Sequence, residues 1–382
     1  LQLPGADMPR IVRLLVRDGW HVEADGRRYR LASTAPAFEL RSGLDWFELR
    51  GGATFDDQQV PLPVLLDAIR KHQQTVALGD GTSGILPEEW LRDFAPFALG
   101  EVEDDHVRFK TSQVGLLDAM LAARPDVSWD ERAAAARARL EALESIPPID
   151  PPEGFTGTLR DYQRDALGWF HFLRELGFGG CLADDMGLGK TVVVLALLQS
   201  RRLEREQQHL PAQPSLVVVP RSVLFNWQQE AARFAPNLRV LDFSGTGRTE
   251  RQHLIASSDL VLVTYGTLRR DASALSDVAF DYVILDEAQT IKNANTAGAK
   301  AARLLNGTHR LALSGTPVEN RGADLWSLFE FLNPGLLSGA TSFGMAFSAD
   351  ADADELRLLS RGLRPFILRR TKEQVASELP AK

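Results

Sequence analysis

Two short segments constrain the fold of this chain more than any other feature. The first reads CLADDMGLGKT over residues 181–191, and the second reads VILDEAQ over residues 283–289. Glycines let successive backbone N–H groups turn toward one anion, and the positive end of a following helix faces the same anion. An apolar run that ends in two acids is typical of a buried parallel strand with a metal-binding edge. Together they predict an α/β chain that binds a nucleoside triphosphate at the carboxyl ends of its strands.

The first segment has the groups that a phosphate-binding loop needs. Gly187 and Gly189 allow the turn, while Lys190 supplies a point charge for the outer phosphates and the Thr191 hydroxyl a ligand for magnesium. The general pattern has a glycine where this chain has Asp184, so a glycine-rich turn before a buried helix is the alternative for the loop taken alone. The expected nucleotide-binding residues of the loop are Asp185, Met186, Gly187, Leu188, Gly189, Lys190 and Thr191.

The second segment supplies acids for hydrolysis. Asp286 can hold magnesium through water, and Glu287 can polarise the attacking water as a general base. An acidic helix N-terminus would look the same in isolation, but the order and spacing of the two segments favour the chemical interpretation. We expect Lys190, Asp286 and Glu287 to be catalytic, with Thr191 and Asp286 as the ligands of Mg²⁺.

Composition narrows the class of protein. The chain has 382 residues, of which 44% are hydrophobic and 25% charged, which is ordinary for two or three globular domains. The single cysteine, Cys181, excludes an internal disulfide and a cysteine-based zinc site. The net charge of −8 argues against strong nonspecific binding of nucleic acid by the chain as a whole but leaves a local basic face open. The sequence has no membrane-length apolar run and no secretory signal, so we expect a cytoplasmic protein, and its start at Leu1 suggests a fragment or a processed product.

The pattern of predicted helices and strands changes near residue 146. Residues 1–145 predict a small accessory α+β domain, with helices at 9–18, 62–72, 113–123 and 130–145 and short strands within 28–57. Residues 146–156 contain four prolines and predict a stiff linker. Helices and apolar strands then alternate through residues 157–382, which predicts a parallel sheet with helices on both faces. The expected strands are 179–183, 215–219, 239–243, 260–264, 281–285 and 310–314.

Several ordered motifs carry a family resemblance. They are LRDYQ at 159–163, DDMGLGKT at 184–191, VP at 219–220 with NW at 226–227, VTYGT at 263–267, DEAQ at 286–289, LSGTP at 313–317, LWSLF at 325–329 and PFILRRTK at 365–372. With them, residues 159–382 closely resemble the first RecA-like lobe of the Swi/Snf-type helicase-like ATPases of helicase superfamily two. Residues 1–145 resemble, more weakly, the accessory region that precedes this lobe in bacterial members.

The resemblance implies ATP as the nucleotide and assigns further roles. Gln163 is expected to read the adenine edge, because a side-chain amide can donate and accept at once. Four residues are expected to couple the phosphate site to the DNA-facing side: Gln289, Ser314, Gly315 and Thr316. Gln289 stands where relatives usually have histidine, and its amide can still hydrogen-bond across to the next motif.

The resemblance also places DNA contacts on loops after the strands, where cations, hydroxyls and amides bind phosphates without reading sequence. The expected contacts are Arg221, Asn226, Trp227, Thr264, Thr267, Lys292 and Asn293. For Trp227, we expect a packed core residue in preference to a stacking platform for bases. Arg369 and Arg370 are assigned with even odds to DNA or to acids within the lobe.

By resemblance, the full-length parent is an ATP-driven translocase on double-stranded DNA that remodels protein–DNA complexes in the bacterial cytoplasm, associated with the nucleoid. Its second RecA-like lobe is expected to follow residue 382 and to supply arginines to the ATP site, so residues 1–382 alone are expected to bind ATP–Mg²⁺ and hydrolyse it poorly. Residues 1–145 are the expected site for a protein partner. The alternatives are an ATPase directed to RNA or to RNA polymerase, a nucleotide-gated scaffold, and an autoinhibitory cover formed by the acidic residues 101–105.

Overall fold

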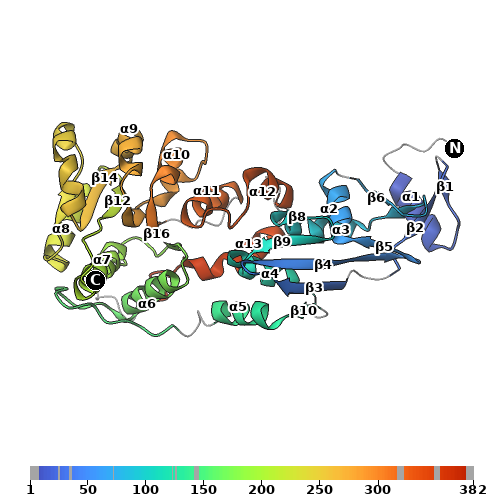
Figure 1. The fold of residues 1–382 in the computed structure, drawn as a ribbon, viewed down its shortest axis with the longest axis horizontal. Helices are drawn as coiled ribbons and strands as arrows, with labels where there is room; N and C mark the ends of the chain where they lie inside the picture. Colours follow the sequence, from blue (N-terminus) through green and yellow to red (C-terminus); the bar gives the residue numbers. More distant parts are fainter. Residues whose placement is uncertain are drawn as a thin grey trace. The chain divides into compact units, whose positions relative to one another are not determined.

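The computed structural model describes residues 8–24, 26–33, 37–71, 73–122, 124, 127–141, 146–315, 322–347 and 353–375. The chain divides into two compact units. Unit 1 comprises Leu1–Glu141 with Leu336–Gly362, and unit 2 comprises Ala142–Gly335 with Leu363–Lys382. Figure 1 shows both units with their helices and strands labelled.

Unit 1 contains two small sheets. Its larger sheet has the order β10-β3-β4-β9-β8, with β5 paired to β4, and its smaller sheet has the order β1-β2-β7-β6. The central strand of the larger sheet, β4, places Phe47, Leu49, Ala53 and Phe55 in the core. The strands are β1 (Glu23–Ala24), β2 (Arg27–Leu31), β3 (Ala37–Ser42), β4 (Trp46–Phe55), β5 (Gln58–Pro61), β6 (Thr75–Ala77), β7 (Ser83–Ile85), β8 (Glu101–Val102), β9 (His106–Lys110) and β10 (Ser128–Trp129).

The helices of unit 1 confirm the predicted α+β character. The four helices that the sequence predicts appear as α1, α2, α4 and α5, each with somewhat shifted ends. The helical segments before residue 142 are α1 (Met8–Arg17), α2 (Leu62–Arg70), α3 (Glu88–Phe94), η2 (Ala95–Leu99), η3 (Thr111–Gln113), α4 (Val114–Leu121) and α5 (Glu131–Glu141).

Residues 336–362 correct the expected boundary of the second domain, because they cluster with unit 1 and not with the rest of 157–382. This segment holds α12 (Ala340–Ala346) and most of α13 (Ala353–Leu363). Gln113 donates a hydrogen bond of 2.9 Å to the carbonyl of Leu336, and Ser338 donates one to the carbonyl of Leu99. Phe343 is buried among the same elements. The chain therefore returns to unit 1 after it has built most of unit 2.

Unit 2 is built on a seven-stranded sheet with the order β13-β14-β12-β15-β16-β11-β17, in which every pairing is parallel. All residues of β12 and β15 are buried, as expected for strands covered on both faces. The six predicted strands are present, and β17 is an additional one. The strands are β11 (Gly180–Leu182), β12 (Ser215–Val219), β13 (Val240–Asp242), β14 (Leu260–Thr264), β15 (Phe280–Leu285), β16 (Gly307–Leu313) and β17 (Ile367–Leu368).

Helices cover both faces of this sheet, which confirms the predicted architecture (Figure 1). α6, α7 and α8 pack in sequence on one face, while α9, α10 and α11 lie on the other. These helices are α6 (Asp161–Glu175), α7 (Lys190–Gln207), α8 (Leu224–Phe234), α9 (Tyr265–Ser276), α10 (Ala297–Leu304) and α11 (Gly322–Leu332); the short helical turns are η5 (Thr246–Ser257), η6 (Ala288–Ile291) and η7 (Arg364–Phe366). Within the described ranges, no helix combines the length and apolar character that crossing a membrane requires.

The proline-rich residues 146–156 lie against unit 2. The Thr156 N–H donates to the carbonyl of Phe234 at 2.7 Å, and the rings of Phe155 and Phe234 stack with centroids 6.0 Å apart. The Ile149 N–H donates to the carbonyl of Arg164 at 3.2 Å. The predicted linker therefore packs on the domain that follows it, and it includes a turn in which the Phe155 N–H donates to the Pro152 carbonyl at 3.1 Å.

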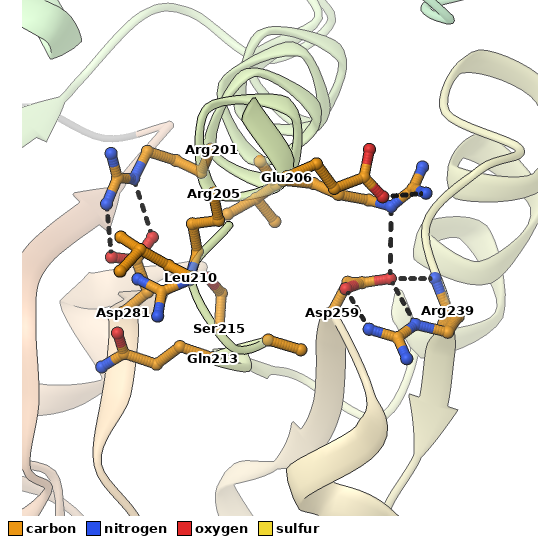
Figure 2. A pocket seen from close by; sticks show the side chains of 12 residues that line it. Arg201, Arg205, Glu206, Leu210, Gln213, Ser215, Arg239, Asp259 and Asp281 are labelled. Carbon is orange, nitrogen blue, oxygen red and sulfur yellow. Dashed lines mark hydrogen bonds and ion pairs between the residues drawn. The ribbon is translucent and has the colours of Figure 1, made fainter. Parts of the chain in front are cut away.

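A network of ion pairs ties α7 to the amino ends of the strands, at the sheet edge opposite the phosphate-binding loop (Figure 2). Arg201 on α7 forms two hydrogen bonds of 2.8 Å with Asp281 at the start of β15, and Arg239 pairs in the same way with Asp259 before β14. They line a pocket of about 360 Å³. Both arginines are paired with acids of the same pocket. We therefore interpret these ion pairs as structural contacts.

Candidate functional site

The loop between β11 and α7 has the backbone shape that its glycines predict. Gly187 has φ of +85° and Gly189 has φ of +80°, a region that residues with a Cβ rarely adopt. A Cβ on Gly189 would also lie 2.5 Å from the side-chain nitrogen of Gln163. The loop runs from the end of β11 at Leu182 to Lys190, the first residue of α7, so the helix N-terminus faces the space inside the loop.

Lys190 lies across the loop that precedes it. Its ammonium donates to the carbonyl of Asp184 at 2.6 Å and to that of Asp185 at 3.3 Å. Burial lowers the pKa of Lys190, while the nearby charges of Asp184, Glu287 and Asp286 oppose that shift. The Lys190 ammonium is therefore hydrogen-bonded to the loop and lies within electrostatic reach of the two acids of the second motif. Thr191 follows in the first turn of α7 and is half-buried.

Asp286 follows the last residue of β15, and both of its carboxylate oxygens are held from within the chain. Oδ2 accepts a hydrogen bond of 2.8 Å from Nε1 of Trp227, and Oδ1 accepts one of 2.9 Å from the Glu287 N–H. The Tyr265 hydroxyl donates to the Asp286 carbonyl at 2.9 Å. Burial raises the pKa of Asp286, and the two hydrogen bonds to its carboxylate act in the opposite direction. The carboxylate is thus fixed in orientation with lone pairs to spare for a metal-bound water.

A hydrogen-bonded chain runs from Glu287 to the end of β16. The Gln289 amide donates to Oε2 of Glu287 at 2.6 Å, and the Ser314 hydroxyl donates to Oε1 of Gln289 at 3.2 Å. The Ser314 N–H donates in turn to the Leu182 carbonyl at 3.1 Å. An amide can therefore bridge the two motifs at the position where relatives usually have histidine.

Gly315, another expected coupling residue, directly follows Ser314 and lies beside the phosphate-binding loop. A Cβ on Gly315 would come within 2.8 Å of Cγ of Met186, so Met186 of the phosphate-binding loop lies over Gly315. Thr316 lies outside the described residues.

The site could hold a metal ion with only one or two ligands from the protein. Among the residues that the structure describes, no group of three or more His, Cys, Asp or Glu side chains is arranged to hold an ion. Mg²⁺ usually binds through one or two carboxylates together with waters and substrate phosphates, so Asp286 and Thr191 are a donor set of the expected size.

Gln163 is committed to the backbone of the loop. Its Oε1 accepts from the Arg160 N–H at 3.0 Å, and its Nε2 donates to the Leu188 carbonyl at 3.1 Å. The Tyr162 hydroxyl donates to the same carbonyl at 3.1 Å. The amide therefore braces the phosphate-binding loop, and its predicted contact with adenine requires it to exchange partners.

Two of the predicted DNA contacts are buried. Trp227 is 1% exposed and bonded to Asp286, which matches the expected packed core residue. Contrary to expectation, Thr267 is also 1% exposed, and its N–H donates to the hydroxyl of Thr264, which caps α9. Four predicted contacts are exposed after β12 and β15: Arg221, Asn226, Lys292 and Asn293.

The sequence interpretation missed two parts of the site. Nothing in the sequence singled out Tyr265, since a tyrosine after a strand has many uses. Asp184 stood out in the sequence only because the general pattern has glycine at that position. That departure was the available signal of a structural role, since the Asp184 carboxylate pairs with Arg370. For Arg370, the structure favours pairing within the lobe over contact with DNA.

A family model described as the SNF2-related domain matches residues 162–382. The chain belongs to this family. Its seven-stranded parallel sheet has the RecA-like fold of the SNF2 ATPase core. The Sulfolobus solfataricus SWI2/SNF2 ATPase core in complex with dsDNA is 40% identical in sequence, with a TM-score of 0.57 over 61% of this chain and 49% of that chain.

Curated relatives of this SNF2 chain are named as ATP-dependent helicases. The Bacillus subtilis (strain 168) protein named "Putative ATP-dependent helicase/translocase YwqA" is 44% identical over 64% of this chain. The Mycoplasma genitalium protein "Uncharacterized ATP-dependent helicase MG018" is 40% identical over 59% of it. The chain spans 27% and 21% of the lengths of these two relatives. These names support an ATP-using, helicase-like hydrolase.

Proposed function

We propose that this chain is the ATP-binding lobe of an SNF2-type ATPase that translocates on double-stranded DNA and remodels protein–DNA complexes. The observation that carries the proposal is the meeting of Lys190, Asp286 and Glu287 at one edge of the parallel sheet, where Lys190 interacts electrostatically with both acids. A loop of backbone N–H groups, a buried lysine and two oriented acids are the parts that phosphoryl transfer to water requires.

Each residue has a role that its contacts support. Lys190 exchanges the two loop carbonyls for the outer phosphates of ATP. Thr191 and Asp286 would hold Mg²⁺, which would neutralise charge on the phosphates. Glu287 accepts a hydrogen bond from the attacking water and orients it, and Gln289 fixes the Glu287 carboxylate in position. Ser314 connects this pair to the end of β16, which gives a path from the acids toward the loops after the strands.

Double-stranded DNA is the partner that we propose for those loops. Arg221 and Asn226 are exposed after β12, and Lys292 and Asn293 are exposed after β15. These side chains suit contact with phosphates, and such contacts carry no sequence information. The similar Sulfolobus core forms a complex with dsDNA, which supports duplex DNA over RNA.

We further propose that residues 1–382 by themselves bind ATP–Mg²⁺ and turn it over slowly. The chain covers 49% of the solved SWI2/SNF2 core, so the remainder of such a core is a candidate source of further catalytic groups. An arginine supplied across a nucleotide cleft contributes about 10³–10⁵ in rate in comparable enzymes.

The test combines binding with turnover. A fluorescent ATP analogue is titrated with Mg²⁺ against the chain, against Lys190→Ala, and against Lys300→Ala as an exposed control on α10. ATPase rates are measured on the same samples with duplex DNA, single strands and RNA. Binding that is lost only in Lys190→Ala supports the proposed site. Stimulation by RNA and not by duplex DNA would replace the DNA-directed function by an RNA-directed one, and analogue binding equal in all three proteins would overturn the proposed site.

A further inference from the structure

The chain returns to the phosphate-binding loop after the main body of the sheet is complete. Strand β17 pairs in parallel with β11, the strand that leads into the loop. The Ala183 N–H donates to the Leu368 carbonyl at 2.7 Å, and the Asp185 N–H donates to the Arg370 carbonyl at 3.0 Å. The first residues of the loop are therefore held by residues 368–370 in addition to α7.

Asp184 and Arg370 fix this return with an ion pair. Oδ1 of Asp184 accepts from the backbone N–H of Arg370 at 3.0 Å and from Nε at 3.1 Å, and Oδ2 accepts from Nη2 at 2.5 Å. The guanidinium also donates to the Tyr162 carbonyl and lies 5.3 Å from the centroid of the Tyr162 ring. Asp184 is 2% exposed, so its charge requires such a partner. The acid at a position where the general pattern has glycine is thus an anchor for the returning segment.

The turn that follows Arg370 is anchored a second time. Val375 is 5% exposed and packs in one buried cluster with Tyr162 and Leu188, the latter a residue of the loop itself. Between the two anchors, the Thr371 N–H donates to the Gln374 side chain at 2.8 Å, and the Gln374 N–H donates to the Thr371 hydroxyl at 3.3 Å. The turn therefore has a defined shape and a defined position on the loop.

Lys372 lies on this turn, beside the loop glycine. Its N–H donates to Oδ2 of Asp185 at 3.0 Å, and its Nζ lies 4.0 Å from the point that a Cβ on Gly187 would occupy. The side chain is exposed, and within the part of the chain that the structure describes its ammonium has no ion-pair partner. Asp184 pairs with Arg370, and the charges of Asp184, Asp185, Asp286 and Glu287 all act on Lys190. Lys372 adds a further positive charge on the Gly187 side of the loop.

We propose that Lys372 is a second nucleotide-binding lysine, which contacts the phosphates of ATP from the Gly187 side of the loop, and that Arg370 is the residue that positions it. The proposal rests on the proposed function, because it concerns the ligand of that same site. Lys190 approaches the phosphates from the start of α7, whereas Lys372 approaches from the returning segment. Binding of a triphosphate then also engages the turn at residues 370–375.

The test measures the affinity of a fluorescent ATP analogue with Mg²⁺ for four variants of the full chain. Lys372→Gln removes the charge, Lys372→Arg keeps it, Lys300→Gln removes the same charge elsewhere on unit 2, and Arg370→Lys keeps charge but loses the paired contacts with Asp184. We expect about three- to tenfold weaker binding for Lys372→Gln and Arg370→Lys, and changes below about twofold for the other two, since an exposed charge contact is worth up to about one power of ten in affinity. Thermal unfolding of each variant checks that it folds.

A double variant separates positioning from a general loss of structure. If Arg370 acts through Lys372, Lys372→Gln combined with Arg370→Lys binds the analogue no more weakly than the weaker single variant, whereas independent effects multiply. Analogue binding that depends on Lys190 but is unchanged in Lys372→Gln would overturn this inference and leave the proposed function in place. Binding that is equally weak in the unaltered chain and in Lys190→Ala would overturn the proposed function together with this inference.

Discussion

The indole N–H of Trp227 donates a hydrogen bond of 2.8 Å to Oδ2 of Asp286. Trp227 belongs to α8, whose first turns carry the exposed Asn226, and Asp286 is the proposed ligand of Mg²⁺. One bond therefore joins the helix that follows a proposed DNA-binding loop to the carboxylate that follows β15. Hydrogen-bond partners of a metal ligand fix the orientation of that ligand, so we expect Trp227 to position Asp286 for the proposed metal.

Trp227→Phe is expected to weaken Mg²⁺ binding about tenfold in the presence of the ATP analogue, because outer partners of metal ligands contribute about 10–100-fold. The phenyl ring fills most of the indole volume but leaves Oδ2 of Asp286 without its donor. The measurement is a Mg²⁺ titration of analogue fluorescence.

Trp169→Phe is the matched control for that titration. Trp169 is also buried, at 5% exposure. Its Nε1 donates to the Pro365 carbonyl at 3.1 Å and not to Asp286. Equal Mg²⁺ dependence in the two variants would show that the Trp227 bond serves packing alone.

Lys190 gives the nucleotide affinity a pH dependence of known sign. Burial lowers the pKa of this lysine below its ordinary value of 10.5, so the ammonium loses its proton at a lower pH than an exposed lysine would. The affinity for the ATP analogue is therefore highest at pH values below the pKa of Lys190, and it falls as the pH rises through that pKa.

Lys190→Arg tests the assignment, because a guanidinium keeps its charge throughout the accessible range. In this variant the alkaline decrease in affinity is expected to disappear, even where the affinity at neutral pH is reduced by the changed geometry. A decrease at the same pH in both proteins would assign the titration to another group.

Gly189→Ala is expected to destabilise the chain and abolish analogue binding. The residue has φ of +80°, and a methyl group would lie 2.5 Å from Nε2 of Gln163, which braces Leu188. The left-handed backbone alone costs a residue with a Cβ about 1–2 kcal/mol. Gly177→Ala isolates that cost, since Gly177 has φ of +74° and no neighbour within 4 Å of the added carbon. Urea unfolding measures both variants, and a loss of free energy no larger for Gly189→Ala than for Gly177→Ala would contradict the predicted clash.

The sequence predicted those features of unit 2 that depend on local pattern. Six strands were predictable because each is an apolar run between helical stretches. The seventh, β17, has two residues, and only its pairing with β11 makes it a strand. The burial of Trp227 was predictable, but its hydrogen-bond partner Asp286 is distant in sequence and was not. Asp184 was conspicuous as a missing glycine, but its partner Arg370 lies 186 residues away. Long-range pairs of this kind leave no periodic signal in a single sequence.

The return of residues 336–362 to unit 1 was hidden for the same reason. The helical pattern of α12 is readable, but its apolar face carries no mark of which surface it covers. Its contacts with η2 and the hydrogen bond from Gln113 to Leu336 join residues more than two hundred positions apart.

The ion pairs of Figure 2 provide a stability prediction in which burial is the variable. Arg201 with Asp281 and Arg239 with Asp259 have the same paired geometry, with closest contacts of 2.8 Å in both. The side chains of the first pair are 17% and 3% exposed, whereas Arg239 is 55% exposed. Asp281→Ala leaves Arg201 partly buried without its main partner and is expected to lower the free energy of unfolding by about 3 kcal/mol. Arg239→Ala is expected to lower it by less than about 1 kcal/mol, because Arg239 is half exposed and the 10% exposed Asp259 keeps the backbone N–H of residue 239 as a donor. Urea unfolding at low and high salt measures both, and salt should reduce the smaller effect more than the larger one. Equal losses in the two variants would mean that the environment of Arg201 is as accessible to water as that of Arg239, and that α7 is held to the sheet by its apolar contacts alone.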